Sequence, residues 1–294
     1  MRILVTGKNG QLGKSLHKLV SEKKYDNEFF FVGRRELDLS SQSNINHYFD
    51  NNNKFDVIVN CAAYTTVDKA EEEQTLTNQV NHLAVKQLAE ITKEQKAKLI
   101  HISTDYVFDG ESSKPYIETD AVNPINVYGK TKLAGEKALQ EVMPTNAIII
   151  RTSWVYSEFG NNFVKTMLKL GKERDELNVV SDQIGSPTYA IDLAEAILKI
   201  VHNKNYQNKE QPTEIYHYSN KGEISCYDFA QEIFKLAEFD CKVRPITANT
   251  YKEQVKRPMY TIMNKHKITK ILPKNGISEW KSSLKIMMDM YEQY

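Results

Sequence analysis

Residues 2–13, which read RILVTGKNGQLG, are the stretch that decides the fold. Residues 2–6 form a short, apolar, β-branched run, and three glycines follow it at intervals of three. Beyond the glycines, leucine and valine recur at helical spacing over residues 12–20. The sequence therefore predicts a strand, a glycine-rich turn and a helix, in that order.

The same alternation continues along the first half of the chain. Four more short apolar runs each end in small or polar residues, at 29–32, 57–59, 99–102 and 148–150. Helix-length segments lie between them, at 43–53, 77–95 and 126–141. This pattern predicts an α/β fold of the Rossmann type, with a doubly wound parallel sheet. In such sheets ligands bind outside the carboxyl ends of the strands, where the polar residues of this sequence gather.

Composition and charge exclude several classes of protein. The 294 residues carry 39 Lys and Arg against 38 Asp and Glu, a formal net charge of +1, which argues against a nucleic-acid binder. No apolar run approaches the ~18–20 residues that cross a bilayer. The start of the chain lacks the order of a secretion signal, and three scattered cysteines fit a reducing compartment, so we expect a cytoplasmic protein. The seven histidines show no metal-ligand spacing, so we expect no metal site, and His101 reads as a satisfied core residue.

The glycine-rich turn has the form GxxGxxG and predicts a phosphate cradle. Glycines allow a tight turn and a close approach of the backbone to a pyrophosphate, and the following helix offers free N–H groups at its positive end. The residues expected to bind a dinucleotide here are Gly7, Gly10, Gln11, Leu12 and Gly13. The alternative is a plain strand-to-helix turn with one packing glycine.

The end of the second run bears on which dinucleotide is bound. In this topology it faces the adenosine ribose, where an acidic residue favours NAD and an arginine can pair with the 2′-phosphate of NADP. Arg34 and Arg35 follow Gly33, so we favour NADPH, with NADH as the alternative cofactor. A solvated pair of charges is the other interpretation. Asp38 and Leu39 are expected beside the adenine, unless Asp38 caps the next helix.

Tyr128 and Lys132 stand four residues apart and would share one face of a helix. A phenol has an ordinary pKa near 10, and a nearby ammonium lowers it by stabilising the phenolate. The YxxxK pattern is common on exposed helices. Here it is accompanied by the glycine-rich turn and by Ser103-Thr104 at the end of the fourth run, which favours a proton-transfer site.

Together these three features resemble the extended short-chain dehydrogenase/reductase superfamily. Four strings resemble, more narrowly, the dTDP-4-dehydrorhamnose reductase family: STDYVFDG at 103–110, NVYGKTKLAGE at 126–136, RTSWVY at 151–156 and GNNFV at 160–164. The resemblance runs nearly end to end, through GSPT at 185–188 and Arg257-Pro258.

The resemblance implies a reaction and roles for three residues. NAD(P)H would deliver hydride to C4 of dTDP-4-dehydro-L-rhamnose and give dTDP-L-rhamnose, a step in nucleotide-sugar biosynthesis for cell-surface polysaccharide. Tyr128 would protonate the nascent alkoxide. Lys132 would tune Tyr128 and hold the nicotinamide ribose, and Thr104 would hydrogen-bond the carbonyl. The partner is then a dTDP-linked 4-keto-6-deoxyhexose, and a homodimer is left open.

Further contacts follow from the same resemblance, each with a plainer interpretation. Ala62, Ala63 and Tyr64 would pass under the cofactor, or serve ordinary sheet packing. The residues expected near the sugar or diphosphate are Thr65, Val67, Asp105, Tyr106, Trp154, Asn161 and Arg257. Trp154 could instead be a core or inter-domain anchor, Asp105 a turn cap, Asn161 or Asn162 a helix cap, and Arg257 a surface residue.

The domain organisation is less regular after residue 155. We expect residues 1–155 to form an NAD(P)-binding Rossmann domain, with returning elements from about 178–220, and residues 156–294 to form mainly an interleaved substrate-binding region. In this part the expected helices are 161–173, 191–202, 226–238 and 279–292, the expected strands 178–180 and 215–219, and the expected loop 203–213.

Two other functions remain open at this point. One is a reductase or epimerase of another nucleotide-linked 4-keto-6-deoxy sugar. The other is a non-catalytic, NADP-binding regulatory subunit similar to the methionine adenosyltransferase beta subunit. Because Thr104, Tyr128 and Lys132 are all present, a pure binding role is the weaker hypothesis.

Overall fold

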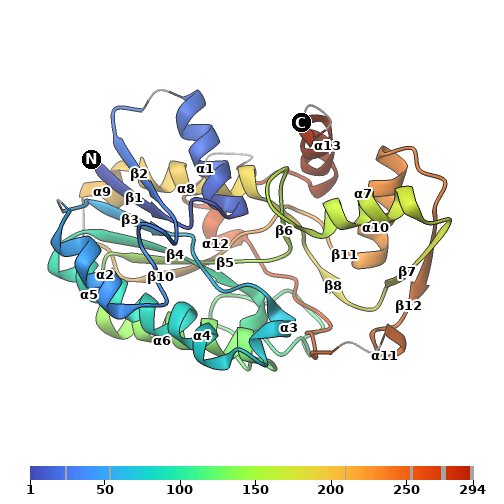
Figure 1. Cartoon of the computed structure of the whole chain (residues 1–294), viewed down its shortest axis with the longest axis horizontal. Helices are drawn as coiled ribbons and strands as arrows, with labels where there is room; N and C mark the ends of the chain where they lie inside the picture. Colours follow the sequence, from blue (N-terminus) through green and yellow to red (C-terminus); the bar gives the residue numbers. More distant parts are fainter. Residues whose placement is uncertain (24, 53, 209, 252–253, 273–275, 292–294) are drawn as a thin grey trace.

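Figure 1 shows the computed structural model, which describes residues 1–23, 25–52, 54–208, 210–251, 254–272 and 276–291. Its larger part is built on a six-stranded sheet in the order β10-β5-β4-β3-β1-β2, with every neighbouring pair parallel. The strands are β1 (Arg2–Thr6), β2 (Glu28–Val32), β3 (Val57–Asn60), β4 (Lys98–Thr104), β5 (Ala147–Thr152) and β10 (Glu214–His217). The predicted α/β class and parallel sheet are confirmed, and β10 returns from far along the chain to extend the sheet beside β5.

Helices cover both faces of this sheet (Figure 1). On β1, Ile3 and Val5 face one layer while Leu4 between them faces the other, so the strand is apolar on both sides. One layer holds α1 (Gln11–Glu22), α8 (Ala190–Val201) and α12 (His266–Thr269). The other holds α2 (Gln42–Asp50), α5 (Ala84–Glu94) and α6 (Val127–Val142).

The helix predicted at 77–95 is interrupted by a π-helical turn. After α3 (Val67–Ala70), the chain forms α4 (Gln74–Asn78), the π-turn η1 (Gln79–Leu83) and then α5. The turn places Asn81 so that its side chain accepts from the Tyr64 backbone N–H at 2.8 Å and donates to the Tyr64 carbonyl at 3.0 Å. A π-turn of this kind often marks a functional site, and here it fixes the segment that follows β3.

A smaller lobe lies to the right in Figure 1 and encloses its own core. Its main elements are α7 (Phe163–Glu173), β7 (Glu176–Val180), α10 (Cys226–Leu236), β12 (Lys242–Ile246), α11 (Ala248–Tyr251) and α13 (Trp280–Tyr291). Short strand pairs link it to the sheet: β6 (Val155–Tyr156) with β9 (Thr188–Tyr189), and β8 (Ile184–Gly185) with β11 (Ile224–Ser225). Aromatic rings fill its core, with Phe229 edge-on to both Tyr156 and Trp280.

One prediction in this part of the chain is wrong, and one strand was not predicted. The segment expected as a loop at 203–213 contains α9 (Lys204–Asn208), and β12 was not expected as a strand. β12 has a largely exposed, charged sequence and a proline, so it lacks the apolar alternation of a strand, and its pairing with β7 determines its conformation. The remaining expected helices and strands are confirmed to within a few residues. No helix in the described ranges has both the length and the hydropathy to span a membrane.

Candidate active site

A cleft of about 820 Å³ runs along the carboxyl ends of the sheet strands. It brings together most of the residues singled out from the sequence. Those that line it are Gly7, Gly10, Gln11, Leu12, Arg34, Asp38, Leu39, Ala62, Ala63, Tyr64, Thr65, Val67, Thr104, Asp105, Tyr106, Tyr128, Lys132, Trp154 and Asn161. Gly13 and Arg257 do not line this cleft and are described below.

The glycine-rich turn has the geometry of an anion cradle. Gly7 has a φ of +72°, and a Cβ there would lie 2.9 Å from the Ala62 nitrogen, so glycine is required. α1 begins after Gly10 with no side-chain cap and no acidic residue in its first turn, which leaves its N–H groups for a ligand. A Cβ at Gly13 would lie 2.2 Å from the Gly7 carbonyl oxygen, so Gly13 allows the helix to pack on the turn and does not form the cleft wall.

The Gln11 side chain joins the cradle to the smaller lobe. Its Nε2 donates to the Val155 carbonyl at 3.1 Å, and its Oε1 accepts from Ser157 and from Asn162 at 3.0 and 2.9 Å. Asn162 also caps α7, because its Oδ1 accepts from the Lys165 N–H at 3.1 Å. Of the two neighbouring asparagines, Asn162 is thus the cap and Asn161 faces the cleft.

Two ion pairs, Arg34 with Asp38 and Lys8 with Glu36, lie near the end of β2. Arg34 is 74% exposed and lies 3.3 Å from Asp38. Burial raises the pKa of Asp38, but hydrogen bonds from Ser40 and the Arg34 guanidinium outweigh this and lower the pKa overall. The idea that Asp38 caps the next helix is wrong, because Ser41 is the residue that caps α2. Lys8 pairs with Glu36 at 2.6 Å in the same region.

Thr104 and Tyr128 meet because helix α6 packs tightly on the end of β4. A Cβ at Gly129 would lie 2.2 Å from the Tyr106 carbonyl oxygen, so the first turn of α6 approaches this segment closely. The side chains of Thr104 and Tyr128 both line the cleft there, close enough for Thr104 to act on the pKa of Tyr128. Thr104 also donates to Asp105 Oδ1 at 3.0 Å and accepts from the Tyr106 N–H at 3.1 Å.

The protonation states of Tyr128 and Lys132 are set mainly by burial. Burial raises the pKa of Tyr128 to about 12, against a lowering contribution from Thr104, and Asp105 raises it further. Burial lowers the pKa of Lys132 to about 8, while Glu136 on the same helix raises it. Lys132 Nζ donates to the Ile102 carbonyl at 2.6 Å and lies 3.2 Å from His101 Nε2. The expected lowering of the Tyr128 pKa by Lys132 is not among the causes of its shift in the described residues, so the phenol keeps its proton at neutral pH.

Asp105 is a buried carboxyl group between the two parts of the molecule. Burial raises its pKa to about 6, although hydrogen bonds from Thr261 and Thr104 act in the opposite direction. Its Oδ2 has no hydrogen-bond partner among the described residues. Asp105 therefore touches the proton-transfer pair on one side and the C-terminal segment on the other.

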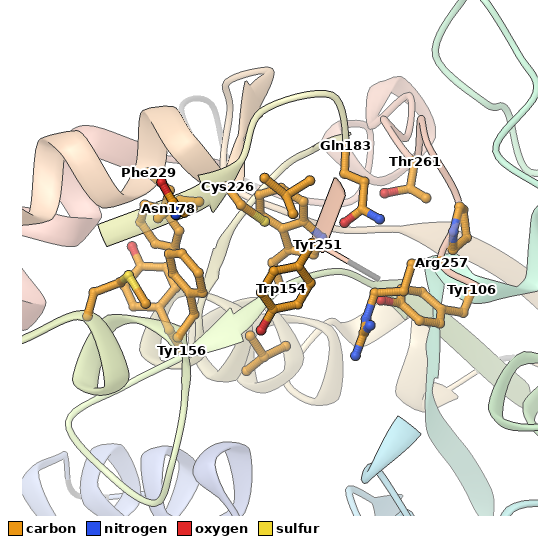
Figure 2. A pocket seen from close by; sticks show the side chains of 16 residues that line it. Tyr106, Trp154, Tyr156, Asn178, Gln183, Cys226, Phe229, Tyr251, Arg257 and Thr261 are labelled. Carbon is orange, nitrogen blue, oxygen red and sulfur yellow. The ribbon is translucent and has the colours of Figure 1, made fainter. Parts of the chain in front are cut away.

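A second cavity of about 390 Å³ opens beyond Trp154 (Figure 2). It shares Tyr106, Trp154 and Val155 with the cleft, so the two spaces adjoin. Trp154 has a φ of +45°, and a Cβ at Gly185 would lie 2.6 Å from its indole ring. The ring therefore packs directly on the Gly185 backbone, as an inter-domain anchor would. It also lines both the cleft and the second cavity.

Arg257 lines this second cavity and reaches across to α3. Its Nη2 lies 2.9 and 3.0 Å from the two oxygens of Asp68. Figure 2 shows the guanidinium near Tyr106. Burial raises the pKa of Tyr106, and the Arg257 charge lowers it by a smaller amount. Arg257 is thus neither a cleft residue nor an unattached surface arginine.

Sequence reasoning missed most of the second cavity and two supporting residues of the cleft. Tyr156 and Phe163 lie in the quoted strings RTSWVY and GNNFV, but no contact was assigned to them. The cavity walls that carried no motif are Met167, Asn178, Val179, Val180, Gln183, Cys226, Phe229, Tyr251 and Thr261. Glu71, which no motif of the sequence singled out, accepts from the Val127 N–H at the start of α6 at 2.8 Å. Asn81 could have been found from the sequence, because it is a polar residue on the apolar side of a helical pattern, and in the structure it is buried. The described residues contain no group of His, Cys, Asp and Glu side chains that could hold a metal ion.

Comparisons with known proteins agree along nearly the whole chain. The family model "RmlD substrate binding domain" matches residues 1–293. A dTDP-4-dehydrorhamnose reductase from Aggregatibacter actinomycetemcomitans is 42% identical, with 97% of each chain covered. A dTDP-4-keto-6-deoxy-D-glucose reductase from Streptomyces niveus is 35% identical over 89% of this chain and 88% of its own. The solved structure of a dTDP-4-dehydrorhamnose reductase from Bacillus anthracis in complex with NADP is 37% identical and covers 98% of this chain and 99% of its own, with a TM-score of 0.89.

Proposed function

This chain belongs to the RmlD substrate binding domain family, and from that membership we propose that it reduces the C4 keto group of dTDP-4-dehydro-L-rhamnose with NADPH, giving dTDP-L-rhamnose. It is an oxidoreductase of the nucleotide-sugar reductase type. The observation that carries the proposal is that Thr104, Tyr128 and Lys132 all line one cleft, which begins at a glycine cradle.

The residues around the cradle fit a dinucleotide. The uncapped start of α1 and the left-handed Gly7 suit a pyrophosphate, and Arg34 at the end of β2 suits a 2′-phosphate. Ala62 and Ala63 give a wall of small side chains along the cleft. Bound NADPH supplies the hydride, and the relative from Bacillus anthracis was solved in complex with NADP.

In this proposal Thr104 and Tyr128 act on the substrate carbonyl oxygen. Thr104 turns its hydroxyl from Asp105 towards that oxygen and stabilises the developing negative charge, a kind of contact worth roughly 10²–10³ in rate. Tyr128 then transfers its proton to the alkoxide, a contribution of about 10²–10⁴. The raised pKa of Tyr128 suits this direction of reaction, because the phenol is protonated at neutral pH and an alkoxide is a much stronger base than a phenolate.

The remaining substrate contacts are assigned by position. The sugar would lie against Trp154 and Tyr106, which border both spaces, with Thr65 and Val67 across the cleft. The nucleotide would extend into the second cavity. Arg257 would exchange its pairing with Asp68 for the diphosphate, which it can bind through two parallel hydrogen bonds.

A second candidate is the reduction of a different dTDP-linked 4-keto-6-deoxyhexose. It is favoured by the 35% identity to the Streptomyces niveus protein named a dTDP-4-keto-6-deoxy-D-glucose reductase. The cleft residues Thr104 and Tyr128 serve either sugar equally well, so the difference would lie in the contacts around Trp154.

The test is NADPH oxidation against a panel of nucleotide-linked 4-keto sugars, with product stereochemistry read by NMR and the Tyr128→Phe variant as control. We expect turnover with dTDP-4-dehydro-L-rhamnose and dTDP-L-rhamnose as the product. Faster turnover of dTDP-4-keto-6-deoxy-D-glucose would assign the second candidate. Protein that retains NAD through purification and consumes no NADPH would instead be an epimerase.

A further inference from the structure

A buried chain of hydrogen bonds runs behind Lys132, from the end of β1 through β3 to β4. It starts at the Ala62 backbone N–H, which lies 3.3 Å from both Thr6 Oγ1 and Asn60 Oδ1. Thr6 donates to Asn60 Oδ1 at 2.7 Å, and Asn60 Nδ2 lies 3.1 Å from His101 Nδ1. Thr6, Asn60, His101 and Lys132 are each at most 1% exposed.

This chain fixes the orientation of the Asn60 amide. The Thr6 hydroxyl and the Ala62 backbone N–H both donate towards the same Asn60 atom, which identifies that atom as the carbonyl oxygen. The NH₂ group of Asn60 is therefore directed at His101 Nδ1, which must accept. Burial, together with the nearby Lys132, lowers the pKa of His101 well below its ordinary value, so the ring is neutral. Its one proton is then on Nε2.

The Nε2–H group of His101 points at Lys132 Nζ, 3.2 Å away. A neutral amine has a lone pair that can accept this hydrogen bond, whereas an ammonium would place one N–H against another. Lys132 Nζ meanwhile donates to the Ile102 carbonyl in either form. A neutral His101 protonated on Nε2 thus favours the amine form of Lys132.

The other charged and titratable groups around Lys132 are few. Tyr128 and Glu136 lie on its own helix α6, and Arg151 on β5 holds the Glu136 carboxylate with bonds of 2.7–3.2 Å. Asp105 in the 3₁₀ turn η2 (Asp105–Val107) acts on Tyr128. His101 is the one group on β4 that contacts Nζ through a side chain in the described residues.

We propose that His101 is a positioning residue for proton transfer: its tautomer, fixed by Asn60, favours the amine form of Lys132 and so makes the Lys132 ammonium a readier proton donor to the phenolate of Tyr128. The inference rests on the proposed role of Tyr128 as the acid. After Tyr128 has protonated the alkoxide, Lys132 gives one proton to a water molecule of the shared cleft, and that water passes one proton to the phenolate oxygen. Lys132 thereby becomes an amine that accepts the His101 hydrogen bond. The amine then takes one proton from water in the cleft.

The wild-type protein tests the tautomer directly. A two-bond ¹H–¹⁵N spectrum of the imidazole, assigned by its loss in His101→Gln, should show a neutral ring protonated on Nε2. A ring protonated on Nδ1 would overturn the proposal, and no substrate or cofactor is needed for this measurement.

The Asn60→Asp variant tests the link to Lys132. A carboxylate can accept from Ala62 and Thr6 and also from His101 Nδ1–H, so the tautomer reverses and Nε2 becomes an acceptor for the Lys132 ammonium. We expect the equilibrium between ammonium and amine to move about tenfold or more towards the ammonium. The measurement is a ¹³Cε lysine NMR titration, and no movement would contradict the inference.

The new carboxylate also acts on Lys132 through its charge, so a double variant separates the two effects. In Asn60→Asp/His101→Phe the charge remains but the imidazole is gone. We expect most of the shift to disappear, and a shift retained in full would overturn the proposal.

Kinetics give a further readout that a merely structural role would not move. In Asn60→Asp the alkaline limb of the kcat profile should move to higher pH by the same amount as the titration, with KM unchanged. A uniform loss of kcat at all pH values would mean a structural role. Failure of the proposed substrate would leave both NMR results standing, so the two proposals fail separately.

Discussion

The cleft and the second cavity lie side by side, but the chain builds them in different ways. The cleft wall comes from contiguous motifs at the ends of β1, β3, β4 and β5, which neighbour one another in the sheet. The second cavity is walled by aromatic and aliphatic side chains from widely separated segments of the smaller lobe. Sheet topology therefore determines where the candidate catalytic residues lie. The packing of the smaller lobe's core determines which part of a substrate can bind beside them.

A small number of polar contacts connect the two spaces. Gln11 donates to the Val155 carbonyl, Thr261 lowers the pKa of Asp105, and Arg257 pairs with Asp68. If chemistry belongs to the cleft and recognition to the second cavity, substitutions on the two sides should separate turnover from substrate binding. The four predictions below test this division, from the largest expected effect to the smallest.

The largest effect is expected from removing one hydroxyl in the cleft. Tyr128→Phe should lower kcat by about 10²–10⁴-fold, because the acid that protonates the alkoxide is lost. The Kd of NADPH, measured by fluorescence titration, should change by less than about twofold, since the phenol is not needed to hold the cofactor. Steady-state NADPH oxidation gives kcat.

A tyrosine of the second cavity provides the matched control. The hydroxyl of Tyr156 is buried without a hydrogen-bond partner among the described residues. Tyr156→Phe should therefore keep kcat within about twofold of the wild type. A similar loss of kcat in both variants would remove the distinction between the two spaces.

The next effect concerns Asp105, where the two spaces meet. Its folded pKa of about 6 lies above the ordinary value of 3.8, so the folded protein binds a proton more tightly than the unfolded chain. The free energy of unfolding therefore falls as pH rises from about 4 to about 6, by up to roughly 3 kcal/mol. Asp105→Asn cannot ionise, so in urea unfolding its stability relative to wild type should rise over this window and then level off.

Asp109 gives a control of opposite sign for that experiment. The Glu111 backbone N–H is the main cause that lowers the pKa of Asp109. Its contribution to stability is present above the unfolded pKa and is lost as pH falls, so Asp109→Asn should lose stability relative to wild type as pH rises. A difference between wild type and Asp105→Asn that is independent of pH would contradict the assigned ionisation of Asp105.

A third, smaller effect is expected on the recognition side. Arg257→Ala should raise the KM of the nucleotide sugar about tenfold, the loss of one charge-assisted pair, while the Kd of NADPH stays within about twofold. Loss of the part-exposed pair with Asp68 should cost stability by at most about 1 kcal/mol. Steady-state kinetics and cofactor titration measure the two binding constants.

Asp68→Asn decides what Arg257 does. If Arg257 binds the diphosphate, freeing it from Asp68 leaves KM unchanged or lowers it. If Arg257 only braces α3, both substitutions raise KM equally, and the recognition role is wrong.

The difference between the two spaces also explains what could be predicted from sequence. Glycine spacing and apolar runs predict the sheet, and parallel strands bring their carboxyl ends to one edge, so Thr104 and Tyr128 could be placed without a structure. The direction of the Lys132 side chain could not, because it depends on the β4 carbonyl of Ile102 and on His101. Asn178, Gln183 and Thr261 depend on how β7 and the C-terminal segment pack, which no local pattern records.

The smallest effect returns to the cleft at its adenosine end, where recognition and not chemistry is at stake. Arg34 is exposed and its pair with Asp38 is worth at most about 1 kcal/mol, so a 2′-phosphate can displace the carboxylate. Arg34→Ala should raise the Kd of NADPH about five- to tenfold and that of NADH by less than twofold, and added salt should reduce the wild-type preference because exposed charges are screened. Arg35→Ala makes the same change in charge at a residue that does not line the cleft, and it should leave both constants nearly unchanged. Equal losses for the two cofactors in Arg34→Ala, or equal effects of the two substitutions, would make Arg34 a solvated surface charge and would leave cofactor choice to groups other than the end of β2.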